Sequence, residues 1–167
     1  PLALARYIRE WEVWLKRNPG AGQPVALSML FWLAEALAEK GEWAEAEIFY
    51  TRVAEGGDPA LRADSLLGAG VAQVKLAKYA SAIRNLETFR RENPEQADAA
   101  NILIPLAQSC IGSGRFEQAA ELAEQAMIDF PEGENNAKAR MLLADALMGQ
   151  RRPAEAAKYY GSVALLY

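Results

Sequence analysis

One short pattern recurs along this chain at an almost constant spacing. Its aligned alanines are Ala46, Ala82, Ala119 and Ala156, and the steps between them are 36, 37 and 37 residues. A second block of small and apolar residues precedes each one, and proline recurs nearby in Asn18-Pro19, Asp58-Pro59, Asn93-Pro94 and Phe130-Pro131. A repeat of this length indicates stacked supersecondary units, each of which must bury its apolar face against its neighbours.

The apolar residues inside each repeat have helical spacing, as the list Met29, Leu30, Leu33, Ala36 and Leu37 illustrates. Turns rich in glycine or charge divide each repeat, at 39–42 and 112–114 for example. The pattern predicts helices near 2–17, 25–40, 60–77, 79–92, 97–113, 116–130, 136–150 and 153–166. Short connections require consecutive helices to pack antiparallel, and there is no strand signal, so the predicted class is all-α.

Proline and glycine mark the irregular places in this pattern. Asp58 and Pro59 suit the N-cap and the first residue of a helix. The stretch 18–24 is the longest break and is expected to be a flexible joint. Pro105 falls inside a helical pattern, where it should kink the helix or leave the carbonyl of Asn101 without its helical partner.

Composition excludes several kinds of site. The chain of 167 residues has no histidine, one cysteine and a net charge of −4. The absence of histidine removes the commonest general base and histidine-containing metal sites, and a single cysteine cannot form an intramolecular disulfide. We expect Cys110 to be a core residue rather than a reactive thiol. We expect no metal, no cofactor, no nucleic-acid partner and no membrane span.

These residues resemble the tetratricopeptide repeat family. The slots of its helix–turn–helix unit are filled here by small residues of the first helix (Ala34, Gly70, Ala107, Ala144), turn glycines (Gly41, Gly114), aromatics after the turn (Trp43, Tyr79, Phe116), later aromatics (Tyr50, Tyr160) and closing prolines (Pro94, Pro131). The resemblance implies a right-handed α-solenoid of antiparallel helix pairs. Pro153 in an aromatic slot, and Ala77 and Arg151 in the turn slot, depart from the pattern.

The resemblance also divides the chain. It implies one solenoid domain over 1–167, with a half repeat at 1–18 and helix-pair repeats at 25–58, 60–94, 97–131 and 136–167. The period is longer than the family's usual one and resembles the variant common in bacterial cell-envelope proteins, which weakly favours a periplasmic or envelope location. We expect a fragment of a longer chain, with a dimer or lattice contact at its uncapped ends through Trp11, Trp14, Leu165, Leu166 or Tyr167.

In this family the first helix of each repeat lines a concave surface that binds partners. Carried over by position, that groove has a polar row (Ser28, Asp64, Asn101, Lys138), an apolar row (Phe31, Leu67, Ile104, Met141, with Trp32 beside it) and a mixed row (Glu35, Val71, Gln108, Asp145). An apolar stripe with a polar rim suits an extended peptide or an amphipathic helix. The alternative is that the apolar row only packs between helices.

Other motifs have ordinary explanations. Gly68-Ala69-Gly70 follows no strand, so close helix packing explains Gly70 better than phosphate binding. Carboxylates such as Glu39 have the spacing of a solvated helix surface, which disfavours a catalytic pair. The sequence therefore predicts a non-catalytic scaffold that binds a protein or peptide. The alternatives are a structural spacer in an envelope-assembly protein and the substrate-recruiting domain of a larger enzyme.

Overall fold

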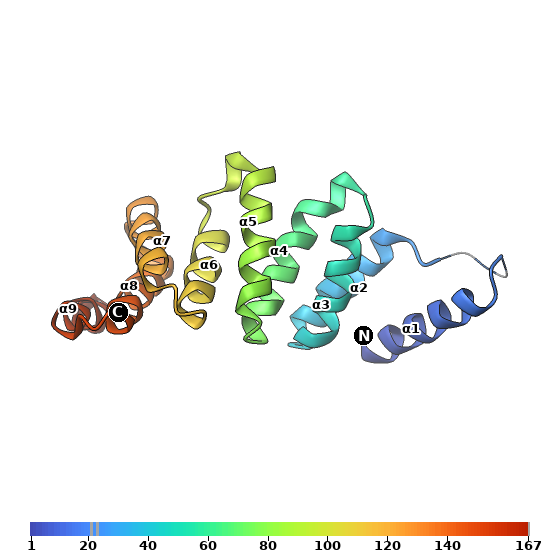
Figure 1. The fold of residues 1–167 in the computed structure, drawn as a ribbon, viewed down its shortest axis with the longest axis horizontal. Helices are drawn as coiled ribbons and strands as arrows, with labels where there is room; N and C mark the ends of the chain where they lie inside the picture. The colour runs from blue at the N-terminus through green and yellow to red at the C-terminus, as the bar shows by residue number, and fades with distance from the viewer. Residues whose placement is uncertain (21, 23, 167) are drawn as a thin grey trace. The chain divides into compact units, whose positions relative to one another are not determined.

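The computed structural model of the protein describes residues 1–20, 22 and 24–166, and this part of the chain contains helices and no strand. Figure 1 labels its nine α-helices. In chain order they are α1 (Leu2–Arg17), α2 (Leu27–Glu39), α3 (Trp43–Glu55), α4 (Pro59–Lys75), α5 (Tyr79–Glu92), α6 (Ala100–Gly112), α7 (Phe116–Asp129), α8 (Gly133–Gly149) and α9 (Pro153–Leu166). The all-α prediction is confirmed. The end contact predicted for Tyr167 lies outside the described residues, and so do Ala21 and Gln23 of the predicted joint.

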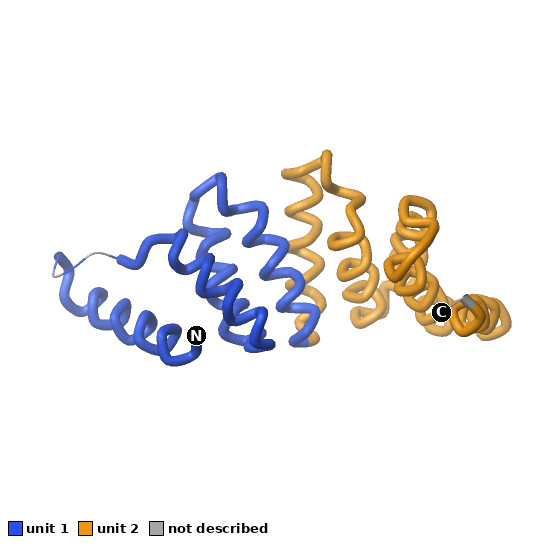
Figure 2. Tube along the Cα trace, turned by 180° about the vertical axis from the view of Figure 1, so that it is seen from behind, with its two compact units in different colours: residues 1–76 blue, residues 77–167 orange. Residues whose placement is uncertain are grey.

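The chain forms two compact units, coloured separately in Figure 2. The first unit is residues 1–76 and holds α1 to α4, and the second is residues 77–167 and holds α5 to α9. The boundary falls between the two helices of the predicted repeat 60–94. A single solenoid domain over 1–167 therefore stays a prediction.

The helix bounds agree with the sequence pattern at most places and differ at three. Helix α3, which begins at Trp43, was not predicted. Its middle is rich in aromatic and β-branched residues of modest helix propensity, and burial of Phe49 and Val53 stabilises it instead. Residues 94–96 form a 3₁₀ turn, so α6 begins at Ala100 rather than at 97. The third difference is α8, which begins at Gly133 rather than at 136.

The core of the first unit contains side chains of α2, α3 and α4 and of the half-repeat helix α1. Phe49 and Val53 of α3 are fully buried among Leu30, Leu33 and Leu37 of α2. Helix α1 adds Ala5 and Ile8 to this cluster. Two ion pairs also link α1 to α3: Arg9 to Glu45 at 2.8 Å, and Arg52 to Glu12.

The second unit alternates first and second helices of the repeats. Helices α5 to α9 pack each on the next, and the first helices α6 and α8 also pack on each other. Small residues such as Ala123, Ala144 and Ala156 are fully or almost fully buried, which lets the backbones approach closely. Pro105 lies buried inside α6, which runs unbroken through it. Cys110 is a buried core residue as predicted, and burial raises the pKa of its thiol to about 11.

The turn between the two helices of a repeat needs one residue with left-handed backbone. Gly41 (φ 75°) and Gly114 (φ 73°) supply it in two repeats. Ala77 (φ 56°) and Arg151 (φ 62°) hold the same conformation in the other two, although a side chain there is unfavourable. The departures from the family pattern at Ala77 and Arg151 thus change the residue and keep the turn.

We expect Ala77→Gly to stabilise the protein by about 1 kcal/mol, because the left-handed penalty of about 1–2 kcal/mol exceeds the entropy cost of a glycine. The midpoint of thermal unfolding should rise by about 2–4 °C, measured by circular dichroism. Gly114→Ala is the matched control and should lower the midpoint. An Ala77→Gly midpoint below that of the wild type would contradict the turn argument.

Candidate functional site

Of the thirteen predicted groove residues, Ser28 lies exposed on α2, and the other twelve also lie on the first helices of the repeats. In the first unit Phe31, Trp32 and Glu35 are on α2, and Asp64, Leu67 and Val71 are on α4; in the second unit Asn101, Ile104 and Gln108 are on α6, and Lys138, Met141 and Asp145 are on α8. None of the twelve is buried. Helix α2 packs on α4, and α6 on α8, so the structure brings together two sets of six, one in each unit.

Aromatic side chains dominate the set in the first unit. Trp32 is 70% exposed and contacts the edge of the Phe31 ring, with 5.9 Å between the ring centroids. Phe31 is half-buried and meets Tyr50 of α3 edge-on at 6.2 Å. Edge-to-face contacts of this kind restrict the orientation of the rings, so the exposed apolar surface of Trp32 is fixed on α2.

Tyr50 is buried and supports the Phe31 ring of this surface, although the sequence interpretation placed it only in a structural slot. The Tyr50 ring lies against Gly68, where an added Cβ would come within 2.6 Å of the ring. Its hydroxyl donates a hydrogen bond to the Glu35 carboxylate. Burial, and then this hydrogen bond, raise the pKa of Tyr50 well above its usual range. Gly68 thus makes a close approach that the sequence reasoning did not assign to it, and Gly70 is buried in the same helix.

The last repeat contains the same tyrosine–carboxylate pair. The Tyr160 hydroxyl donates to Asp145, and this hydrogen bond is the main reason that the pKa of Tyr160 rises to about 12. Both pairs join residues fifteen positions apart, from the first helix of a repeat to its second. Two carboxylates of the mixed row are thus oriented by the protein itself. The recurring spacing of Glu35–Tyr50 and Asp145–Tyr160 was the sequence signal that could have revealed them.

The set in the second unit has a smaller apolar centre. Met141 is 48% exposed, and Ile104 is half-buried. The flanking side chains of Asn101 and Gln108 are exposed. Lys138 forms an ion pair with Glu134 at 2.7 Å, and this contact lowers the pKa of Glu134. The apolar centre therefore has a polar edge on both sides.

The apolar row is shared between packing and surface. Phe31, Leu67 and Ile104 are half-buried, whereas Met141 is exposed. Three of the four members therefore use part of their surface to pack against their own unit and present the rest. Gly68-Ala69-Gly70 lies inside α4 rather than in a loop.

The described residues also bear on metal binding and on membrane crossing. Among the described residues, no group of three or more aspartate, glutamate, histidine or cysteine side chains is placed to hold a metal ion. Within the same part of the chain, no helix combines the length and the apolar character that crossing a membrane requires.

Comparison with known structures supports a repeat fold. The chain is 21% identical to the structure described as "MamA 41-end from Desulfovibrio magneticus RS-1", with a TM-score of 0.71 over 97% of this chain and 82% of that one. The structure described as "MamA MSR-1 C2" is 20% identical, with a TM-score of 0.72 over 98% and 89% of the two chains. These likenesses in fold, together with the all-helical structure, confirm the predicted α-solenoid class. A comparison with curated proteins found no match.

Comparison with protein families covers nearly the whole chain. Two family models, both described as tetratricopeptide repeat, match it: one over residues 3–60 and 67–107, the other over residues 110–165. The matched ranges include all the predicted groove residues except Asp64 and Gln108. The chain belongs to the tetratricopeptide repeat family.

Proposed function

We propose that the protein binds a peptide or an amphipathic helix of a partner protein on the exposed faces of its first helices. A general role as a protein-interaction scaffold follows from the family, because tetratricopeptide repeats are protein-interaction scaffolds and are typically non-catalytic. The proposal that the first-helix faces bind the partner rests on one observation above all. The exposed Trp32 ring packs edge-on with Phe31, near the Glu35 carboxylate that Tyr50 orients.

The chemistry of the two faces suits an amphipathic partner. Binding energy in such interfaces comes mainly from a few aromatic or large apolar anchors in a polar rim. Trp32 and Phe31 would be these anchors in the first unit, and Met141 and Ile104 in the second. Exposed polar side chains beside them, Asp64, Asn101, Lys138 and Asp145, would pair with polar groups of the partner and fix its register.

The test is affinity capture from a lysate of the source organism, followed by a titration with the purified partner. Met141→Asp replaces an exposed side chain, so it should leave the fold intact while it removes capture. Trp32→Ala should weaken binding by about 2 kcal/mol, roughly thirtyfold, as expected for an aromatic anchor. Isothermal titration calorimetry would measure the change.

The matched control is Ile128→Asp, on the second helix α7. Ile128 is 73% exposed and lies outside the proposed faces, so the same charge is introduced on an apolar residue that is even more exposed than Met141. It should bind like the wild type. Equal capture by all variants, or capture by none, would contradict the proposal and favour a structural spacer.

A further inference from the structure

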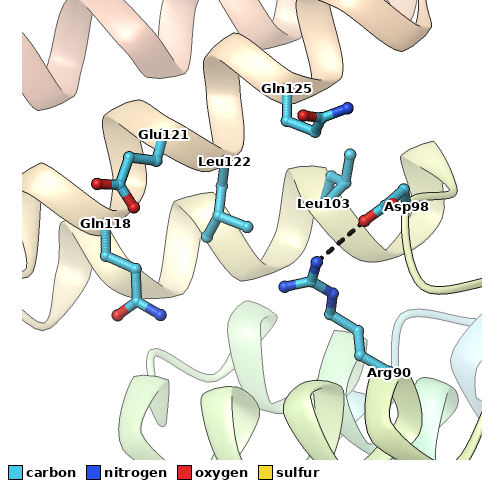
Figure 3. A pocket seen from close by; sticks show the side chains of 7 residues that line it. All are labelled: Arg90, Asp98, Leu103, Gln118, Glu121, Leu122 and Gln125. Carbon is cyan, nitrogen blue, oxygen red and sulfur yellow. Dashed lines mark hydrogen bonds and ion pairs between the residues drawn. The ribbon is translucent and has the colours of Figure 1, made fainter. Parts of the chain in front are cut away.

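A pocket of about 420 Å³ opens in the second unit among helices α5, α6 and α7 (Figure 3). Leu103 and Leu122 form its apolar part, between Glu121 on one side and Asp98 on the other. Gln118, Gln125 and Arg90 complete the lining. Its volume is in the range of sites that bind small ligands or single side chains, about 300–1,000 Å³. None of these residues belongs to the proposed partner-binding faces.

The next repeat shows what the equivalent place can hold. In the next repeat, 37 residues further along, Arg140 is at the position equivalent to Leu103, and Ser162 is at the position equivalent to Gln125. There the Arg140 guanidinium lies between helices, where its Nε donates to Asn136 Oδ1 at 2.6 Å and one terminal nitrogen donates to Ser162 Oγ at 3.2 Å. The fold therefore accommodates a guanidinium group in this position when the chain supplies one. Around the pocket the chain supplies leucine instead.

The polar lining of the pocket is biased towards hydrogen-bond acceptors. Gln118 Nε2 donates to Glu87 at 3.3 Å, and Gln125 Nε2 donates to Asp129 at 2.7 Å. Because carboxylates only accept, the amide nitrogens must face them, which leaves the amide oxygens of Gln118 and Gln125 to accept from a ligand. Glu121 adds a carboxylate.

The charges around the pocket favour a cation. Arg90 donates to the Ala97 carbonyl and to Asp98 Oδ1, both at 3.0 Å, so its own charge is engaged. The lining otherwise carries Asp98 and Glu121, with Glu87 and Asp129 behind the two glutamines. The surrounding segment 99–134 has a net charge of −5. An anionic ligand would meet repulsion here, and a cationic one attraction.

We propose that this pocket binds an arginine side chain of a partner protein. Leu103 and Leu122 are buried and close the floor of the pocket, so the arginine would be held mainly through its guanidinium group. The guanidinium would donate to Glu121 and to the glutamine oxygens, in the position that Arg140 occupies one repeat further along. Its planar fork of donors suits several acceptors at once.

The test is a titration of the full 167-residue chain with N-acetyl-arginine amide, followed by ¹⁵N NMR. The side-chain amide signals of Gln118 and Gln125 should shift saturably. N-acetyl-citrulline amide has the same shape without the charge, and it should bind at least tenfold more weakly. Glu121→Lys, at an exposed position, should weaken arginine binding at least tenfold without unfolding the chain.

The matched control is Glu124→Lys, which makes the same charge change at an exposed position of α7 outside the pocket lining. It should keep arginine binding within about twofold. Absence of saturable shifts, equal binding of citrulline, or equal losses in the two lysine variants would overturn the proposal. Met141→Asp should leave this titration unchanged, so failure of the first-helix faces and failure of the pocket are distinguishable.

Discussion

Gly149→Ala is expected to destabilise the protein by about 1–3 kcal/mol, although alanine is the better helix former. Gly149 is the last residue of α8, and the Phe116 ring covers it from the start of α7. A Cβ at Gly149 would lie 2.2 Å from Phe116 Cδ1, a distance that real Cβ atoms do not show. The ring must therefore move out of a packed site, and the overpacking outweighs the gain of about 1 kcal/mol in helix propensity.

The same contact recurs one repeat earlier, which makes it a feature of the architecture. A Cβ at Gly112 would lie 2.3 Å from the Tyr79 ring. The position one period before Gly112 is Lys75, whose ammonium lies 6.0 Å from the centre of the Trp43 ring. The aromatic residue that opens each of these second helices thus covers the end of the first helix of the next repeat.

Urea unfolding measures this effect, and Gly161→Ala is its control. A Cβ at Gly161 of α9 would meet nothing within 4 Å, so there alanine should stabilise the helix. The double variant Phe116→Leu, Gly149→Ala should regain part of the stability lost by Gly149→Ala alone. If Gly149→Ala is as stable as the wild type, the ring does not constrain the position.

The periodicity of the sequence was sufficient to predict the all-α class and most helix bounds, because burial on one face imposes a helical spacing. It was insufficient for α3, where aromatic and β-branched residues from Ile48 to Val53 weaken the local helix signal. Gly112 illustrates another limit. The sequence interpretation assigned it to a turn, whereas its role is to accept the Tyr79 ring from another helix. That contact depends on three-dimensional packing.

The candidate sites were predictable to different extents. Position within the repeat was enough to choose residues on first helices that the structure leaves unburied. The hydrogen bond from Tyr50 to Glu35 required knowledge of how two helices face each other. The pocket was not predictable, since its lining comes from α5, from α6 with the segment before it, and from α7, which only the folded arrangement brings together.

The caps at the C-terminal ends of the second helices were not predicted, because the sequence marked the Asn-Pro pairs only as a recurring motif. In the structure the side-chain amides of Asn18 and Asn93 donate to the carbonyls of Trp14 and Phe89 within their own helices. At the end of α7 the corresponding residue is Phe130, and the amide of Asn136 from the next helix bonds its carbonyl at 2.8 Å. Only the folded arrangement identifies Asn136 as the residue that replaces the missing cap.

Phe49→Ala is expected to have the largest effect, a loss of about 3–5 kcal/mol, because the Phe49 side chain is fully buried in the core of the first unit. In a repeat protein each element is stabilised mainly by its neighbours, so the damage should concentrate near the substitution. Hydrogen exchange followed by mass spectrometry should show the greatest loss of amide protection in α2, α3 and α4.

Phe89→Ala provides the reciprocal experiment in the second unit. Phe89 is also buried, with only 1% of its surface exposed. It removes the same ring from the other core, so the greatest loss of protection should fall in α5 and α6 instead. Because the two substitutions are chemically identical, a difference between their exchange maps must come from the position of the ring. Identical, uniform losses in both variants would mean that residues 1–76 and 77–167 unfold in a single cooperative step, and would contradict the expectation of local damage.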